Sequence, residues 1–272
     1  MPSFRLTLAY DGTDFTGSQV QPNQRTVQGE LEGVLGVIAG TPVRAVFAGR
    51  TDRGVHAVGQ VAAVRLTAWE STPLELQHAL NARLPIDVAA TDASRCADSF
   101  NPRYDALWRE YRYWIACGTV SPFLARYAWM RRTRLDAEFI RTGAQQLVGV
   151  HDFAAFAGAG DGVPWSSRAA TARGTTRTIL RCDCQEVRPR IAPGSDRYAK
   201  VLEVRVVADG FLPHMVRNIV GALLQVGQGQ RQPEWIRELL VGRDRRAGPA
   251  AAPPQGLTLL RVGFAGDALD DG

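Results

Sequence analysis

The sequence predicts an α+β protein made of two related α/β lobes. Strand and helix patterns are mixed along the 272 residues, and a similar order of elements begins again near residue 106. A hydrophobic content of 45% is enough to form the core of one large domain or of two ordinary ones. We expect lobes of residues 1–106 and 107–272, with mixed, largely antiparallel sheets on either side of a basic cleft.

The first half of the chain alternates between strand and helix patterns. Apolar side chains recur on one face of FRLTLAY, which is typical of a half-buried strand. Thr26 can cap a helix that Gly40 would end, and Pro73 suits the first turn of a second helix. The elements expected here are strands at 4–10, 43–49 and 60–66 and helices at 27–38 and 73–84.

The second half repeats this mixture with longer elements. EYRYWIAC alternates as a strand does, and apolar residues from Phe139 to Leu147 recur at helical spacing. The elements expected here are strands at 110–117, 198–210 and 256–264 and helices at 136–148, 212–227 and 233–242. Polar, glycine-rich and proline-rich stretches predict loops at 158–167, 188–195 and 245–255.

Composition excludes several classes of function. No stretch approaches the roughly 18 apolar residues of a membrane span, and Arg5 precedes any apolar signal region, so we expect a cytoplasmic protein. The four cysteines are too few and irregular for a disulfide framework, and the scattered histidines indicate no metal site. Lys200 is the only lysine and follows alanine, which excludes a phosphate-binding P-loop. The net charge of +5 favours an anionic partner such as nucleic acid.

The stretch FAGRTDRGVHAVGQV, residues 47–61, is the strongest candidate for a chemical site. A guanidinium at Arg50 would keep the Asp52 carboxylate ionised and available as a base or nucleophile. Gly49 and Gly54 would let a ligand come close. The alternative is a turn aspartate bound to its own backbone, with a surface ion pair.

Two further motifs could contribute polar groups to the same chemistry. Tyr111 and Tyr113 lie two apart on a strand, so both point the same way, beside Arg109. Such a tyrosine could stack on a base and move a proton, or could simply pack in the core. Arg217 falls within a predicted helix next to apolar residues, where a charge needs an acidic partner such as Asp52.

Taken together, these motifs resemble the tRNA pseudouridine synthase A family over nearly the whole chain. The AGRTDRGVHAVGQV and HMVRN motifs are specific to it. The matching stretches, in order, are YDGTDFTG, RTVQGELE, AGRTDRGVHAVGQV, NARLP, REYRYWI, HDFAAF, FLPHMVRNIVG and GLTLLRV. The resemblance implies the pseudouridine synthase fold and an isomerase that converts uridine to pseudouridine in tRNA.

The resemblance also implies roles for individual residues. Asp52 matches the catalytic aspartate, and Tyr111 matches the tyrosine that stacks on the target base. Arg50 matches the arginine that enters the RNA as the target nucleotide leaves its stack. Arg217 matches the partner of the aspartate, and Leu257 an apolar residue of the base pocket. The other residues expected to contact substrate are Arg53, His56, Arg103, Arg109 and His214.

Such enzymes use no cofactor or metal and act as homodimers on the anticodon arm of tRNA, at three adjacent uridine positions. Asp52 could attack the ribose anomeric carbon, add to the uracil ring or remove the ribose C2′ proton, and the sequence leaves these alternatives open. The target base must leave its stack, and contacts with phosphates together with Arg50 would help to offset the free-energy cost of this unstacking.

The chain departs from the family pattern at a few positions near these motifs. Ser18 stands where tryptophan is usual, which removes an aromatic side chain near the expected RNA face. Arg53 replaces a small residue, and Asn101-Pro102 replaces a frequent His-Ala pair. Glu110 puts an acid beside Tyr111 where a basic residue is common.

Two other functions are possible on the same residues. One is a tRNA-binding or folding factor that has lost catalysis, against which the full catalytic set argues. The other is a metal-dependent phosphodiesterase that uses Asp11, Asp52 and His56, although the sequence shows no clustered ligand set.

Overall fold

The computed structural model describes residues 2–66, 69–70, 72–118, 122–158, 174–188 and 200–269. The chain divides into two compact units: unit 1 comprises Met1–Arg109 with Thr258–Gly272, and unit 2 comprises Glu110–Leu257. Residues 258–272 are grouped with unit 1, in which the last strand pairs with β3, and the division into lobes of residues 1–106 and 107–272 stays a prediction. The mixture of strands and helices confirms the predicted α+β class.

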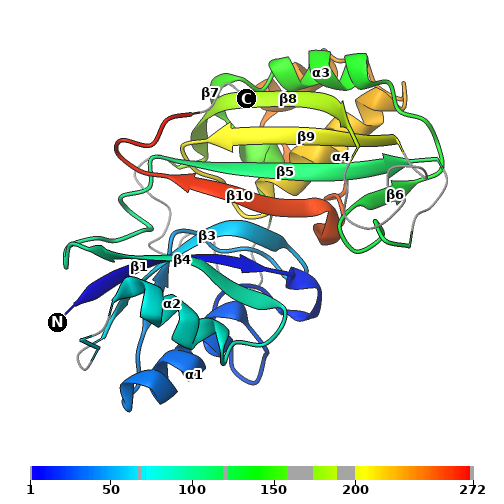
Figure 1. Ribbon diagram of the computed structural model, residues 1–272. Helices are drawn as coiled ribbons and strands as arrows, with labels where there is room; N and C mark the ends of the chain where they lie inside the picture. Colours follow the sequence, from blue (N-terminus) through cyan, green and yellow to red (C-terminus); the bar gives the residue numbers. More distant parts are fainter. Residues whose placement is uncertain are drawn as a thin grey trace. The chain divides into compact units, whose positions relative to one another are not determined.

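Unit 1 is a sheet with two helices on one face (Figure 1). Its strand order is β4-β1-β3-β10, and the short β2 also pairs with β3. The strands are β1 (Ser3–Tyr10), β2 (Ala45–Phe47), β3 (His56–Arg65), β4 (Val88–Cys96) and β10 (Leu257–Gly263), and the helices are α1 (Val27–Ala39) and α2 (Pro73–Asn81). β1 is antiparallel to both β3 and β4, whereas β10 is parallel to β3.

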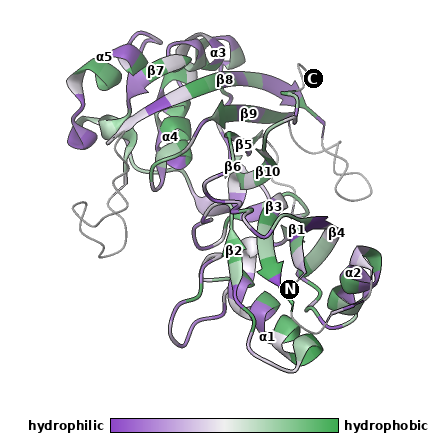
Figure 2. Ribbon diagram, turned by 90° about the vertical axis from the view of Figure 1, so that its left-hand side faces the viewer, coloured by the Kyte–Doolittle hydropathy of each residue, from purple (hydrophilic) through white to green (hydrophobic). Residues whose placement is uncertain are grey.

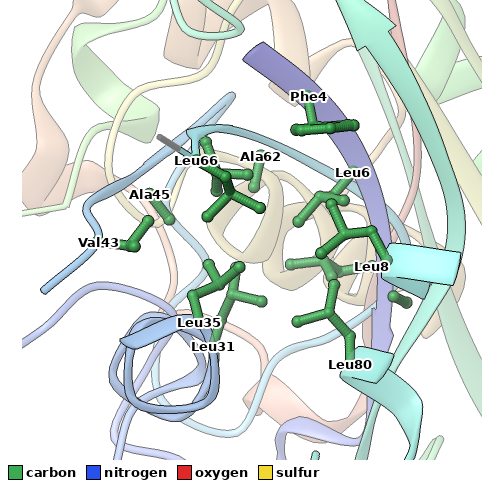
Figure 3. Packing of buried hydrophobic residues seen from close by; sticks show 13 residues of the cluster. Phe4, Leu6, Leu8, Leu31, Leu35, Val43, Ala45, Ala62, Leu66 and Leu80 are labelled. Atoms are coloured by element: carbon green, nitrogen blue, oxygen red, sulfur yellow. The ribbon is translucent and has the colours of Figure 1, made fainter. Parts of the chain in front are cut away.

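The sequence patterns explain how unit 1 folds. Alternate residues of β1 point towards α1 and α2, where Leu31 and Leu35 of α1 meet Leu80 of α2 (Figure 3). The Thr26 hydroxyl accepts a hydrogen bond from the Gly29 backbone N–H, which starts α1 as predicted. The buried hydrophobic core consists, in sequence order, of Phe4, Leu6, Leu8, Leu31, Leu35, Val43, Ala45, Ala62, Val64, Leu66, Leu76, Leu80 and Ala90.

The last strand lies unusually close to β3. A Cβ atom added at Gly59 would lie only 2.1 Å from the Leu260 carbonyl oxygen, so a larger residue at 59 would force the strands apart. The register pairs Thr258 with His56 and Leu259 with Ala57. The C-terminal segment therefore supports the strand that begins directly after the Asp52 motif.

Unit 2 contains five strands and three helices among its described residues. Its strand order is β5-β9-β8-β7, and β6 pairs in parallel with β5. The strands are β5 (Trp108–Cys117), β6 (Trp129–Arg131), β7 (Gly149–Asp152), β8 (Thr176–Val187) and β9 (Lys200–Ala208), and the helices are α3 (Ala137–Gln145), α4 (Met215–Gly227) and α5 (Trp235–Gly242). α3 packs on β8 and on α4. Figure 2 shows α4 largely in the colours of hydrophobic residues, as its burial requires.

Several element boundaries differ from the expectation. Two of the longer strands, β4 and β8, were not predicted. α4 begins at Met215, so Arg217 lies in its first turn and not in the middle of the helix. Most of the predicted loops 158–167 and 188–195, and the start of the strand expected at 198–210, lie outside the described residues. No described helix is both long enough and apolar enough to cross a membrane.

Candidate active site

Asp52 lies on a tight turn between β2 and β3 and is partly exposed. The Val55 N–H donates a hydrogen bond of 3.1 Å to the Asp52 carbonyl oxygen, which closes the turn. Gly54 has a φ of 76°, and this left-handed backbone conformation favours glycine. The sequence RTDRG therefore folds as a turn that presents the Asp52 carboxylate, with Arg50 and Arg53 exposed on either side of it.

Thr51 fixes this turn from the inside. Ser18 and Thr51 exchange two hydrogen bonds: the Ser18 N–H donates to the Thr51 carbonyl at 3.0 Å, and the Thr51 N–H donates to the Ser18 hydroxyl oxygen at 2.8 Å. The Thr51 and Tyr10 hydroxyl groups are also hydrogen-bonded, at 2.8 Å. All three side chains are buried. The residue before Asp52 therefore has little freedom to move.

Gln60 extends the same network to the glycine that precedes Arg50. Its fully buried side chain donates to the Gly49 carbonyl at 3.0 Å and lies 3.4 Å from the Tyr10 hydroxyl. Burial raises the pKa of Tyr10 to about 12, against the opposing effect of its hydrogen bonds to Thr51 and Gln60. The Tyr10 phenol is therefore neutral at physiological pH. We call Tyr10, Ser18, Thr51 and Gln60 the frame of the Asp52 turn.

His56 supports the other end of the turn. The Gly12 N–H donates to the His56 Nδ1 atom at 3.0 Å, and Asp11 Oδ1 lies 3.2 Å from the same nitrogen. A Cβ atom at Gly12 would lie 2.0 Å from the Val55 carbonyl oxygen, so the backbone segments touch. His56 is buried inside this contact. Across the described residues, no group of three histidine, cysteine or acidic side chains could hold a metal ion, Asp11, Asp52 and His56 included.

Arg103 and Arg109 lie with Arg50 on unit 1. Arg50 and Arg103 are exposed, and Arg109 donates to backbone carbonyls in both segments that hold them. The pKa of Arg50 is lowered, first by partial burial and then by the positive charge of Arg103. The hydrogen bonds of Arg109 bring together the backbone segments that carry these two arginines. This is a cationic surface beside the Asp52 turn.

Unit 2 holds the predicted tyrosine pair on β5. The Tyr111 ring is mostly buried and meets Phe211 edge to face, with ring centroids 5.1 Å apart at an interplanar angle of 86°. Tyr113 is fully buried, and its hydroxyl donates to the Pro253 carbonyl at 2.8 Å. Burial raises the pKa of Tyr113 well above its ordinary value. Tyr113 is thus a core residue whose hydroxyl is bound to the backbone, whereas the Tyr111 ring packs against Phe211.

The first turn of α4 brings together the remaining predicted residues of unit 2. Arg217 donates from Nε to the Ala252 carbonyl at 2.7 Å, and the Ala252 N–H donates to the Arg217 carbonyl at 2.9 Å. His214 precedes the helix in a left-handed conformation, with a φ of 57°. Leu257, the first residue of β10, is buried. Arg217 and His214 thus lie where α4 meets its neighbouring loops.

The unusual residues of the sequence have structural partners. Ser18 belongs to the frame of the Asp52 turn. Glu110 lies on the opposite face of β5 from Tyr111, is fully buried, and accepts hydrogen bonds from Arg205, including one from Nε at 2.9 Å. The Asn101 side-chain oxygen accepts from the Arg103 N–H at 3.1 Å, which shapes the turn before β5.

The predicted site residues thus form two groups. Unit 1 gathers Arg50, Asp52, Arg53, His56, Arg103 and Arg109 around the turn, and unit 2 holds Tyr111, His214, Arg217 and Leu257. How the two groups combine stays a prediction. The sequence reasoning gave no role to Tyr10, Thr51, Gln60 or Phe211. For Gln60 a signal existed, since an amide within an otherwise apolar strand pattern indicates a buried hydrogen-bonding role.

Comparison with known proteins places this geometry in a family. The model described as tRNA pseudouridine synthase matches residues 7–105 and 144–265. The chain belongs to the tRNA pseudouridine synthase family. Both matched segments contain site residues: the first includes the Asp52 turn with its frame, and the second includes Arg217 and Leu257.

Curated relatives agree over nearly the full length. A tRNA pseudouridine synthase A of Thermosipho africanus is 40% identical over 264 residues, covering 97% of this chain and 100% of that protein. Proteins of the same name from Maridesulfovibrio salexigens and Solidesulfovibrio magneticus are 39% and 42% identical, covering 96% and 97% of this chain and 90% and 92% of their own lengths. As a tRNA pseudouridine synthase the protein is an isomerase acting on uridine in tRNA, and it has the pseudouridine synthase fold.

Proposed function

We propose that this enzyme uses Asp52 to isomerise uridines in the anticodon stem-loop of tRNAs, without a cofactor, as a cytoplasmic homodimer. The observation that supports the proposal best is the frame of the Asp52 turn. Buried hydrogen bonds fix Thr51, while Asp52 itself is partly exposed beside Arg50 and Arg53. A carboxylate held rigidly by such a turn needs no reorganisation before it reacts.

The chemistry needs no redox step and no water. The bond between uracil N1 and ribose C1′ breaks, the ring turns, and C5 bonds to C1′; C5 then loses its proton and N1 gains one. The Asp52 carboxylate can begin this by attacking C1′, by adding to the uracil ring or by removing the C2′ proton. Tyr111 would stack on the detached uracil and is the candidate to accept the C5 proton, with its ring held against Phe211.

The target nucleotide has to leave its stack before Asp52 can reach it. Extrusion costs a few kcal/mol, which contacts between arginines and phosphates can offset. Arg50 would fill the space that the nucleotide leaves, and Arg53 would lie against the RNA. We further propose that Arg217 pairs with Asp52 and that Leu257 lines the base pocket, as the family resemblance implies.

The two histidines of the predicted set have a supporting role in this proposal. His56 accepts from Gly12 inside the contact between two backbone segments, so it would shape the turn without touching RNA. His214 would similarly set the start of α4. Asp52, Tyr111 and the exposed arginines remain as the groups that would meet the substrate.

The decisive experiment measures tritium released from uracil C5 of labelled, unmodified tRNA. The purified wild-type protein should release tritium in the presence of a chelator, and Asp52→Asn should release none while binding tRNA with similar affinity. Asp92→Asn is the matched control, because Asp92 is an exposed aspartate of the same unit. Tritium release by Asp52→Asn would refute the assigned role, and no release by the wild type would favour the non-catalytic tRNA-binding alternative.

Companion measurements test the finer parts of the proposal. Chemical mapping of pseudouridine should find it on the 3′ side of the anticodon stem-loop, and sedimentation should give the mass of a dimer. Tyr111→Phe keeps an aromatic face and Tyr111→Leu does not, so we expect the leucine variant to lose much more tRNA turnover if stacking dominates. Equal losses would instead indicate that the hydroxyl is the essential group.

A further inference from the structure

The Arg109 guanidinium connects two chain segments that both expose arginines. Its Nη2 atom donates to the Ala48 carbonyl and to the Arg103 carbonyl, each at 3.0 Å, and its Nη1 atom donates to the Ala106 carbonyl at 3.2 Å. Arginine suits this position because its planar fork presents several N–H donors in fixed directions. A lysine ammonium has a single nitrogen and would not reproduce the fork of Nη1 and Nη2.

These bonds set where Arg103 lies relative to Arg50. Since one nitrogen reaches the carbonyls of Ala48 and Arg103, the segment leading to Arg50 and the turn carrying Arg103 lie against each other. Both arginine side chains are exposed. The lowered pKa of Arg50, caused by partial burial and then by the Arg103 charge, agrees with this proximity.

The turn that carries Arg103 is ordered by its own contacts. The Asn101 side-chain oxygen accepts from the Arg103 N–H, and the Asn101 N–H donates to an Asp105 carboxylate oxygen at 2.8 Å. The Leu107 N–H donates to the Gly263 carbonyl at 2.8 Å, which fixes the end of the turn to β10. The hydrogen bonds of Arg109 to the Ala48 and Arg103 carbonyls then join this turn to the segment before Arg50.

Two neighbouring cations without a carboxylate between them form a place for an anion. Within the described ranges, no ion pair links Arg50 or Arg103 to an acidic side chain. Like charges repel each other, and a phosphate accepts hydrogen bonds from both guanidinium groups at once. Tyr104, which is 76% exposed, adds an aromatic ring with its centroid 5.8 Å from the Arg103 guanidinium.

We propose that Arg103, in the cationic surface that it shares with Arg50, binds a phosphate of the RNA backbone, and that Arg109 is the positioning residue that holds the two arginines side by side. Arg109 was expected to contact the substrate directly, and here it acts through Arg103 instead. The inference rests on the proposed function, because it takes tRNA as the anion. Arg109 would thereby affect tRNA affinity and leave the chemical step at Asp52 unchanged.

The test is the salt dependence of tRNA binding by Arg103→Ala, Arg109→Lys and the double variant. Loss of one phosphate contact should lower the slope of log K against log salt by about 0.7–0.9 and weaken binding roughly two- to fivefold. Arg109→Lys keeps the net charge, so a merely structural change would not move this slope. We expect the salt slope of Arg109→Lys to fall as in Arg103→Ala and to fall no further in the double variant. We also expect the KM for tRNA to rise while kcat is kept.

Two further variants make the result decisive. Arg83→Lys is the matched control, because Arg83 is an exposed arginine that donates to a backbone carbonyl, that of Ala79, on α2; its slope should equal that of the wild type. Asn101→Ala loosens the same turn without touching Arg109 and should lower the slope as Arg109→Lys does, even if Arg109→Lys folds poorly.

A wild-type slope in Arg109→Lys or Asn101→Ala would overturn the inference. The inference would also be overturned if Arg103→Ala lowered the salt slope by the same amount in the wild-type protein and in Arg109→Lys, because independent residues give additive effects. If the wild-type protein neither binds nor modifies tRNA, the proposed function fails and this inference fails with it. If the wild-type protein modifies tRNA with an unchanged slope in all variants, only the inference fails.

Discussion

Replacing Ser18 with alanine should destabilise the Asp52 turn through the loss of a single hydrogen bond. The Ser18 and Thr51 residues are 1% and 6% exposed, and the lost bond is the one of 2.8 Å from the Thr51 N–H to the Ser18 hydroxyl. The reciprocal bond of 3.0 Å joins backbone atoms and stays. A buried N–H left without an acceptor costs about 1–3 kcal/mol, so with an m value of about 2 kcal/mol/M the urea midpoint should fall by roughly 0.5–1.5 M.

Urea unfolding and tRNA turnover, measured on the same preparations, test this reasoning. We expect turnover at saturating tRNA to fall along with stability, because Asp52 follows Thr51 directly. Ser3→Ala is the control: the buried Ser3 hydroxyl donates to the Asp98 carboxylate at 2.7 Å, and exposed Asp98 can bind water instead. Ser3→Ala should lose less stability and keep turnover. A wild-type urea midpoint for Ser18→Ala would refute the argument, as would an equal loss of turnover in Ser3→Ala.

Three further changes test other parts of the structure. Burial raises the pKa of Tyr10 to about 12 from 10.0, so between these pH values the folded state holds a proton that the unfolded state releases. The stabilisation should be complete below pH 10 and fall by up to about 1.4 kcal/mol per pH unit above it. Urea midpoints measured against pH should fall less steeply in Tyr10→Phe. Glu110→Ala should cost about 3–5 kcal/mol in urea unfolding because it leaves Arg205 without its buried partner, whereas replacing both with apolar residues should cost much less. Gly49→Ala should change stability by no more than about 0.5 kcal/mol, since its Cβ atom meets no neighbour within 4 Å, yet reduce tRNA turnover if RNA approaches there; Gly12→Ala, whose Cβ atom would lie 2.0 Å from a carbonyl oxygen, should instead impair folding itself.

Local signals in the sequence were sufficient for most elements and failed for particular strands. α1 could be predicted at both ends because Thr26 caps its start and Gly40 adopts the left-handed conformation that ends it. β4 was missed because it is the edge strand of unit 1, and after Ala90 most of its residues are polar or only partly buried. β8 was missed because its inward residues include two cysteines and its register shifts between Ile179 and Arg181.

The Asp52 motif could be recognised, but the frame that holds it could not. Tyr10 and Ser18 reach Thr51 across more than thirty positions of the chain, so no local pattern connects them. The same limit explains why the role of Ser18 was not predicted. Ser18 stands where the family usually has tryptophan, but its hydroxyl is well suited to accept a hydrogen bond from the buried Thr51 N–H. The sequence places the acid Glu110 beside Tyr111, yet strand alternation turns its carboxylate to Arg205 on the other face.

The return of β10 to unit 1 has a consequence for how the protein is made. A ribosome releases residues 1–109 long before β10 has been synthesised. β10 is the strand whose Leu260 carbonyl oxygen would lie 2.1 Å from a Cβ atom at Gly59. Unit 2 is one continuous stretch of the chain, whereas the strand carrying His56 keeps an open edge until residues 257–263 have been synthesised. The nascent chain therefore holds an unfinished sheet next to the Asp52 turn until residues 257–263 close it.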